Sequence, residues 1–325
     1  KSKIEPGAQR DRPSVAFAST IAAVFTPIVA TLGLASTVFA KDECGLAVAG
    51  VVTCNAETYK NKENIPIHYE ELGGVTVDVD GVSIIDEAKI PRTAILAKVN
   101  NSASEGAIAI NVTNTTLKTG DPDIIGSSRD KRIPGLYSPA IRGDQSGFGP
   151  VAVSLGEGSS ITTYGFNAIG AYAFQGTIGN ANENIQNKSD VLVEFSGEDS
   201  KISTYGRYSH GILSRSNTGF NNIYVKASEG YITTHGNDSY GVNGKNIGEA
   251  SGSDGDIFLS TVDLTVLADG RRSQAVSATN QSDSGGVYID VKGSSLTASG
   301  SSGHGVYAFS QGGTIYLGSG PINLR

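Results

Sequence analysis

One short pattern recurs six times along this chain of 325 residues. It joins an apolar residue, a stretch usually rich in Ser and Thr, and a glycine: LKTG (117–120), ITTYG (161–165), ISTYG (202–206), ITTHG (232–236), VLADG (266–270) and LTASG (296–300). The six glycines are spaced by 45, 41, 30, 34 and 30 residues. A drifting period of this size is typical of stacked repeat units joined by loops of variable length. The pattern therefore predicts a solenoid rather than a single globular core.

Each repeat contains three short segments in which apolar and polar residues alternate. The clearest repeat reads VLVEFSG (191–197), KISTYG (201–206) and HGILSRS (210–216). Alternation with a period of two predicts strands, and stacking lets each strand pair in parallel with its counterpart about 4.8 Å away in the next coil. We therefore expect an all-β fold, a parallel β-helix of about six to seven coils. A β-sandwich is the alternative, but it would show hairpin turns and no self-similarity at roughly 30 residues.

The repeats also predict which residues face inward. The expected inward columns are Val191, Ile223, Ile257 and Val287 in the first strand, Ile161, Ile202, Ile232, Val266 and Leu296 in the second, and Ile141, Ala171, Ile212, Val242, Val276 and Val306 in the third. The recurring glycine fits a corner at which the backbone takes a positive φ.

Composition and charge narrow the possible partners. The chain carries 42 Gly, no Trp, no Met and a net charge of −7. Many short strands joined by tight turns suit such a composition. The sequence contains no basic stripe that could neutralise phosphates, so we expect no nucleic-acid partner.

Residues 1–40 have the organisation of a secretory signal peptide. Arg10 and Arg12 precede an uncharged, largely apolar run that ends in Val38-Phe39-Ala40, directly before Lys41. A positive segment, an apolar segment and small residues before a cleavage point are the features of such a peptide. The alternative is a membrane-spanning helix, since the run exceeds roughly 18 residues. We expect a helical, signal-like segment that precedes the solenoid.

The two cysteines, Cys44 and Cys54, lie close together in the sequence ECGLAVAGVVTC. A zinc site needs four ligands, and the nearby sequence offers only His68 as an imidazole. If the chain is exported, a single short disulfide is the preferred interpretation; two free buried thiols are the alternative. We assign residues 41–72 to an N-terminal cap and residues 73–325 to the β-helix.

An outward row of large apolar side chains is expected on the first strand of each coil: Leu192, Tyr224, Phe258, Tyr288 and Tyr316. Such a row can dock a protein or a glycan. It can equally stabilise the ladder by stacking between strands. Tyr172, Phe174, Tyr307 and Phe309 face outward on the third strand and are interpreted in the same way.

Arg142, Gly143 and Asp144 spell the tripeptide that integrins recognise. A match of this length arises by chance roughly once in twenty-five chains of this size. Alignment of SPAIRGDQ with SHGILSRS puts Arg142 and Asp144 outward and Gly143 inward, within a strand or at its entry into a turn. An integrin role is therefore kept only as a hypothesis.

The sequence does not indicate a catalytic site, a metal site or a cofactor. A polysaccharide-cleaving β-helix needs paired carboxylates on one strand face. Here the outward column Glu194, Lys226, Ser260 and Asp290 carries mixed charges, which is typical of a solvated face. His210 and His304 occupy the same repeat position, and we interpret both as structural turn residues. The expectation is a protein that is not an enzyme.

The chain resembles the N-terminal part of a bacterial autotransporter passenger, of the pertactin-like or adhesin type. Three features carry the resemblance: the leader ending in VFA, the segment ECGLAVAGVVTCNAETYKNKENIPIHY, and the repeated S-x-I-T-T-x-G…G-x-x-A-x-S coil. It implies a type V secretion product of a Gram-negative bacterium that folds outside the cell as a right-handed β-helix. Its outer-membrane barrel would lie beyond Arg325.

The resemblance and the outward rows together give the expected function. We expect a surface-exposed or secreted passenger that adheres to a host cell-surface protein, matrix protein or glycan, or to itself, without catalysis. Two alternatives are a β-helix enzyme that degrades polysaccharide and a secreted effector that binds a host receptor.

Overall fold

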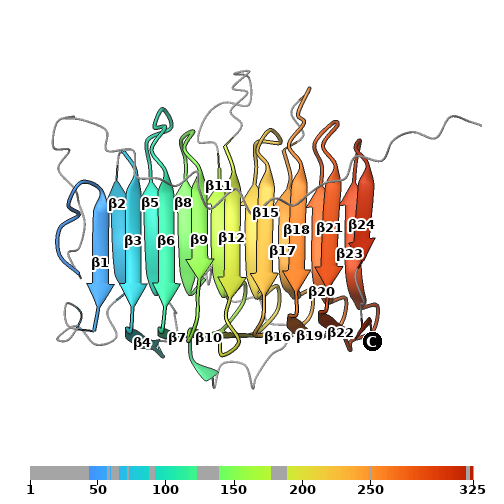
Figure 1. Cartoon of the computed structure of the whole chain (residues 1–325), viewed down its shortest axis with the longest axis horizontal. Coiled ribbons are helices and arrows are strands. Elements are labelled where there is room, and N and C mark those ends of the chain that lie inside the picture. Colours follow the sequence, from blue (N-terminus) through green and yellow to red (C-terminus); the bar gives the residue numbers. More distant parts are fainter. Residues whose placement is uncertain are drawn as a thin grey trace, which may run out of the picture. The chain divides into compact units, whose positions relative to one another are not determined.

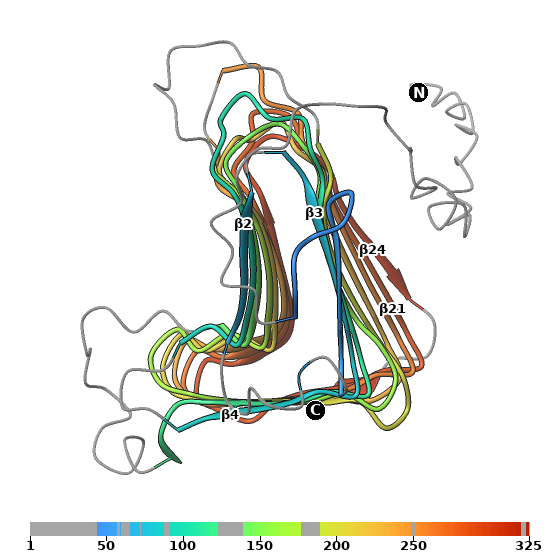
Figure 2. The ribbon, with the colours of Figure 1, turned by 90° about the vertical axis from the view of Figure 1, so that its left-hand side faces the viewer.

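The alternating segments form strands that pair with the equivalent segments of neighbouring repeats. The computed structural model describes residues 44–56, 59, 66–71, 73–87, 92–122, 139–176, 189–248, 251–319 and 323–324. Within these ranges α-helix is absent, and the strands run from β1 to β25. The strands make three sheets in which neighbours are parallel and one coil apart. Figure 1 shows the coils stacked in sequence order, and Figure 2 shows the three sheets as three sides around a common interior. The predicted all-β parallel solenoid is confirmed.

The three sheets are named here sheet I, sheet II and sheet III. Sheet I contains β1 (Val51–Asn55), β3 (Val75–Asp80), β6 (Ile108–Thr113), β9 (Val151–Leu155), β12 (Val191–Ser196), β15 (Ile223–Ser228), β18 (Ile257–Val262), β21 (Val287–Lys292) and β24 (Ile315–Ser319). Sheet II contains β4 (Ser83–Asp86), β7 (Thr116–Thr119), β10 (Ser160–Tyr164), β13 (Lys201–Tyr205), β16 (Tyr231–His235), β19 (Thr265–Asp269), β22 (Ser295–Ala298) and β25 (Asn323–Leu324). Sheet III contains β2 (Ile67–Glu71), β5 (Ile95–Val99), β8 (Ile141–Gln145), β11 (Ala171–Gln175), β14 (Ile212–Ser216), β17 (Tyr240–Asn246), β20 (Gln274–Asn280) and β23 (His304–Ser310).

Each complete coil passes through sheets I, II and III in that order. Within the described ranges, seven coils are complete: β3–β5, β6–β8, β9–β11, β12–β14, β15–β17, β18–β20 and β21–β23. This agrees with the expected six to seven. The segment 41–72, expected as a cap, contains strands of its own: β1 pairs with β3, and β2 pairs with β5. The sheets therefore begin before residue 73.

The predicted inward columns are in register and form the core. The first-strand residues Val191, Ile223, Ile257 and Val287 pair in sequence across sheet I, and each is 0 % exposed. The columns of sheets II and III pair as expected. Only Val306, in the last complete coil, is partly rather than fully buried among these residues. Stacked Val and Ile side chains thus fill a continuous interior, with roughly 1.5–3 kcal/mol of stabilisation for each full burial.

The recurring glycines form the corner between sheets II and III, mostly for the expected reason. Gly120, Gly165, Gly206, Gly236 and Gly270 have φ values of 86°, 126°, 123°, 155° and 151°. The exception is Gly300, which is not among the residues with positive φ. A Cβ at Gly300 would overlap the carbonyl oxygen of Gly270, so close stacking of the corners requires glycine there.

A ladder of buried serines fixes the same corner. The Ser239 hydroxyl donates to the carbonyl oxygen of Gly206 at 3.0 Å and accepts from the backbone N–H of Ser209 at 3.0 Å. Ser273 repeats the arrangement one coil later, with its hydroxyl 2.8 Å from the Gly236 carbonyl oxygen. These bonds satisfy backbone groups that the turn would otherwise leave buried without a partner. These bonds therefore fix the corners that precede β17 and β20.

The expected signal-like helix over residues 1–40 lies outside the described residues. Among the residues that are described, none belongs to a helix long and apolar enough to span a membrane.

Candidate ligand-binding cleft

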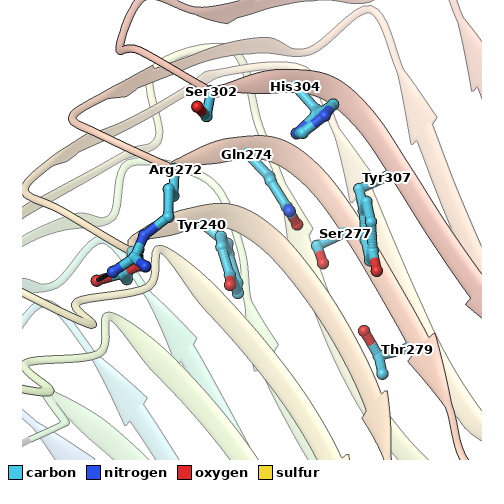
Figure 3. Close-up of a pocket in the computed structure, with 9 residues that line it drawn as sticks. Tyr240, Arg272, Gln274, Ser277, Thr279, Ser302, His304 and Tyr307 are labelled. Atoms are coloured by element: carbon cyan, nitrogen blue, oxygen red, sulfur yellow. Dashed lines mark hydrogen bonds and ion pairs between the residues drawn. The ribbon is translucent and has the colours of Figure 1, made fainter.

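A cleft of about 400 Å³ opens on the outer face of sheet III. It crosses the last three strands of that sheet, β17, β20 and β23, and the corners that precede them (Figure 3). Its lining is Asp238, Tyr240, Arg272, Gln274, Ser277, Thr279, Ser302, His304 and Tyr307. Side chains from three successive coils thus share one space that is lined by hydroxyl, amide, charged and aromatic groups.

The first residue of each sheet III strand at the cleft supplies one wall. Tyr240 pairs in register with Gln274, and Gln274 pairs with His304. One coil earlier, His210 stacks on Tyr240 with ring centroids 4.8 Å apart, and the Tyr240 backbone N–H donates to His210 Nδ1 at 3.1 Å. The sequence interpretation of His304 as a turn residue is wrong: it begins β23 and lines the cleft. An outward position at the start of a strand aims its side chain over the sheet, whereas a turn residue would project beyond the edge.

Gln274 is the most informative residue of the cleft. It is 9 % exposed, and its side-chain Oε1 has no hydrogen-bond partner among the described residues. Figure 3 shows Gln274 and Ser277 between Tyr240 and Tyr307, which agrees with the register of β17, β20 and β23. A buried acceptor left without a partner costs about 1–3 kcal/mol. A ligand that donates a hydrogen bond at this point would recover that free energy.

An ion-pair cluster forms the rim of the cleft at the corner. Asp238 accepts from Arg272 Nε at 2.7 Å and from Arg207 Nε at 3.1 Å. The two arginines belong to the corners on either side of Asp238 along the solenoid axis. One carboxylate therefore joins three successive corners, and the cluster keeps a positive charge in excess.

Burial keeps His210 neutral beside the cleft. It lowers the pKa of His210 to about 3, and the nearby charges of Lys245 and Arg215 lower it further in the same direction. Because Nδ1 accepts the Tyr240 N–H, the neutral ring carries its proton on Nε2. Burial likewise raises the pKa of the Tyr240 phenol, which stays protonated and able to donate.

The predicted outward row on sheet I is in register, and its aromatic rings pack on one another. Tyr224 and Phe258 stack at 5.1 Å between centroids, and Phe258 and Tyr288 stack at 5.0 Å. Leu192 is 9 % exposed and Tyr316 is 55 % exposed, so the two ends of the row differ in accessibility. The stacking supports the structural interpretation of this row.

The outward aromatics of sheet III fall into two groups. Tyr172 and Phe174 lie upstream of the cleft in a small apolar cluster with Ile169 and Leu213. Tyr307 lines the cleft itself, and Phe309 on the same strand is 40 % exposed. The sequence placed all four on the outer face correctly, but it did not separate the packed pair from the open one.

The integrin-type tripeptide lies inside strand β8. Gly143 faces inward, and Arg142 Nη2 donates to Asp144 Oδ2 at 2.6 Å. The Arg142 guanidinium also lies over the rings of Tyr172 and Phe174, at 5.5 and 5.9 Å from their centroids. The two charges that an integrin would bind are thus paired with each other, in a geometry that does not favour recognition.

Cys44 and Cys54 are joined by a disulfide with their Cα atoms 5.2 Å apart. The Cys44 backbone N–H donates to the Tyr69 hydroxyl at 3.2 Å, which ties the disulfide to β2. Among the described residues, no group of three or more His, Cys, Asp or Glu side chains could hold a metal ion.

The corner residues were missed from the sequence, although a signal for them exists. Tyr208, Asp238, Arg272 and Ser302 all have φ values of 58–59°, and each lies two residues after a corner glycine. This left-handed conformation is uncommon for a residue with a side chain. Because it recurs in successive coils, it places three of these side chains, those of Asp238, Arg272 and Ser302, at the cleft. The signal is the position two residues after each corner glycine. The residue type at that position differs from coil to coil.

Similarity to known proteins does not identify a ligand for the cleft. Compared with protein-family models, with curated protein sequences and with solved structures, the chain matches none.

Proposed function

We propose that the chain is a non-catalytic binding module that holds its partner along the outer face of sheet III. The cleft carries the proposal, because three successive coils line it and its central residue, Gln274, keeps a buried acceptor without a partner. Binding sites commonly combine aromatic walls with a few placed polar groups, and Tyr240, Tyr307, Gln274 and Ser277 make this combination. The cleft crosses three successive coils, which suits an elongated partner.

Two titratable residues, Asp238 at the rim and His210 beside the cleft, are held in structural contacts. Asp238 accepts from Arg207 and Arg272, so both of its oxygens are engaged by side chains of the protein itself. His210 has a pKa of about 3 and cannot act as a general acid near neutral pH.

Export to an oxidising compartment is part of the proposal. The Cys44–Cys54 disulfide supports it, since such bonds persist outside the cytosol. The parallel solenoid supports the resemblance to autotransporter passengers. We therefore propose that the chain acts on the outer-membrane surface of a Gram-negative bacterium or in its secretions, with right-handed winding, a cleaved leader and delivery by the type V route.

The partner would be a host cell-surface protein, a matrix protein, a glycan or a second copy of the chain. The test is binding of the whole chain to cultured host cells, to immobilised matrix proteins and to itself. Gln274→Leu and Tyr307→Ala should each weaken the binding that is seen, by roughly tenfold. Tyr231→Ala is the control, since Tyr231 is 57 % exposed on sheet II, away from the cleft.

Three results would overturn the proposal. The first is that the folded chain binds none of these partners. The second is that Gln274→Leu and Tyr307→Ala bind as well as Tyr231→Ala. The third is turnover of a polysaccharide by the chain, which would favour the enzymatic alternative.

A further inference from the structure

Two cationic side chains, those of Arg215 and Lys245, lie side by side next to the cleft, and no acidic side chain of the described residues pairs with them. Arg215 on β14 pairs in register with Lys245 on β17, both on the outer face of sheet III. Arg215 Nε donates to the neutral Asn217 Oδ1 at 3.0 Å, and its guanidinium lies 5.7 Å from the Phe174 ring centroid. Among the described residues, neither Arg215 nor Lys245 has a carboxylate within ion-pair distance.

The same column of sheet III is neutralised in earlier coils. On β2 and β5, Glu70 and Lys98 approach to 3.9 Å. On β8, Asp144 is paired with Arg142 at 2.6 Å. Among the described residues, the column next carries Arg215 and Lys245 on β14 and β17, without a carboxylate in ion-pair distance, just before it enters the cleft at Thr279.

The unpaired cations are costly to the folded chain. Like charges directly opposite one another on neighbouring strands are destabilising. Burial lowers the pKa of Lys245, and the charge of Arg215 lowers it further. An anion bound between the two side chains would relieve both effects.

Lys245 borders the cleft, and Arg215 lies one strand further from it. Lys245 pairs in register with Thr279, and Asn243 on the same strand pairs with Ser277. Thr279 and Ser277 both line the cleft, next to Tyr307 and the buried Gln274 oxygen. One continuous surface therefore offers two positive charges, several neutral hydrogen-bonding groups and an aromatic ring.

We propose that this surface binds an acidic oligosaccharide, with a sugar ring in the cleft against Tyr307 and a carboxylate or sulfate at Arg215 and Lys245. Sugar hydroxyls supply the donor that Gln274 Oε1 lacks, and the apolar face of a pyranose packs on an aromatic ring. Neutral polar groups beside cations distinguish this surface from a simple patch for polyanions. The inference rests on the proposed binding function and names the class of partner for it.

The spacing of the strands sets the direction and length of the ligand. From β14 to β23 the sheet advances by three coils, which is roughly 14 Å at 4.8 Å per coil. About three sugar units, laid along the solenoid axis, would reach from the cations to Tyr307. A charged unit at one end and a ring at the other would then be recognised together.

The test measures binding of the whole chain by isothermal titration calorimetry. The probes are a hyaluronan hexasaccharide, which carries uronates, a neutral chitin hexasaccharide of similar length, and hexaglutamate as an acidic peptide. The hyaluronan hexasaccharide should bind at least tenfold more tightly than either of the others. Lys245→Gln and Arg215→Gln should each weaken its binding by roughly tenfold.

Lys226→Gln is the matched control. Lys226 is an outward lysine on β15, in register with Glu194 and Ser260, and it belongs to sheet I, whereas the cleft lies on sheet III. It should leave the affinity unchanged. Circular dichroism and the urea midpoint of each variant test whether it is folded. If Lys245→Gln does not fold, Arg215→Gln alone tests the role of the cations.

Each outcome bears on the inference. Equal binding of the neutral hexasaccharide, or an affinity indifferent to Lys245 and Arg215, overturns it. If hexaglutamate binds as tightly as the hyaluronan hexasaccharide, the proposal of a saccharide ligand is wrong, and an acidic protein is the partner instead. If none of the three probes binds while the chain still binds cells or itself through Gln274 and Tyr307, the inference fails and the proposed function stands; if no binding of any kind occurs, both fail.

Discussion

The outer faces of sheets I and III carry similar side chains in different arrangements. On sheet I, Tyr224, Phe258 and Tyr288 form an unbroken stack with interplanar angles of 11° and 10°. On sheet III, the stack of His210 and Tyr240 is interrupted in the next coil by Gln274, whose buried oxygen has no partner among the described residues. In an unbroken row the rings stack on one another and stabilise the ladder. In an interrupted row, polar groups remain that could accept a hydrogen bond from a ligand. The proposed function thus assigns structure to one face and binding to the other, although the two carry similar side chains.

The largest expected effect is at the corner that positions the sheet III face. A Cβ at Gly236 would overlap the carbonyl oxygen of Gly206, and its φ of 155° disfavours any side chain. We expect Gly236→Ala to lower the free energy of unfolding by about 3 kcal/mol, measured by urea denaturation. Gly81→Ala, at the corner between sheets I and II, should cost about 1 kcal/mol, because φ is 65° but no atom lies within 4 Å. Equal losses at the two sites would show that stacking of the corners is not the cause.

The next effect is on the pH dependence of stability. His210 has a pKa of about 3 in the folded chain and about 6.5 in the unfolded chain, so the unfolded state binds the extra proton between these values. Stability from this residue is complete above pH 6.5 and falls as the pH is lowered toward 3, by up to about 1.4 kcal/mol per pH unit. His210→Gln should remove that slope. Glutamine is chosen because it occupies the equivalent position, 274, two coils later.

The difference between wild type and His210→Gln isolates this residue from other titrating groups. For example, burial raises the pKa of Asp190, which gives a slope of the opposite sign at lower pH. Urea midpoints measured at several values between pH 7 and pH 4 provide the comparison. Parallel curves for the two proteins would mean that His210 is not buried in its neutral form.

The comparison of the two faces is tested directly by one truncation on each. Phe258→Ala removes two ring stacks and should cost about 2 kcal/mol of stability while leaving ligand binding unchanged. Tyr307→Ala removes an open ring and should change stability by less than about 1 kcal/mol while it weakens binding by roughly tenfold. If Phe258→Ala weakens binding and Tyr307→Ala does not, the roles of the two faces are reversed.

Much of the fold could be predicted from the sequence because its physical determinants are local. Alternation with a period of two fixes the inward face of each strand, and self-similarity fixes which strands pair, so Val191, Ile223 and Ile257 fell into one column. The corner glycines followed from the same pattern. At Gly300 the residue was expected correctly for a different reason, since close approach to Gly270, not a positive φ, requires it.

The cleft could not be predicted from the sequence. Alternation shows whether a side chain points inward or outward, but it does not show how exposed an outward side chain is. Leu192 and Tyr316 were placed in one outward row, yet one is 9 % and the other 55 % exposed. Asp238 and Arg272 reach the rim only through a left-handed backbone that periodicity does not reveal. Arg142 pairs with Asp144 two residues along the same strand, whereas Arg215 bonds to Asn217 at the same offset, and the side-chain rotamers that decide such pairing appear only in three dimensions.

The smallest expected effect concerns the paired end of the sheet III column. Arg142 is held by Asp144 and by two aromatic rings, so Arg142→Ala and Asp144→Ala should each leave attachment of integrin-bearing cells unchanged, and a soluble RGD peptide should not compete. Both side chains are partly buried, and their loss should cost no more than about 1 kcal/mol. In a single assay, Arg142→Ala is expected to preserve binding while Arg215→Gln weakens it, although both arginines point outward from the same sheet. Loss of attachment in Arg142→Ala with an unchanged urea midpoint would show that the ion pair opens to a receptor. The presence of an ion pair would then no longer distinguish the proposed structural role of Arg142 from the proposed binding role of Arg215.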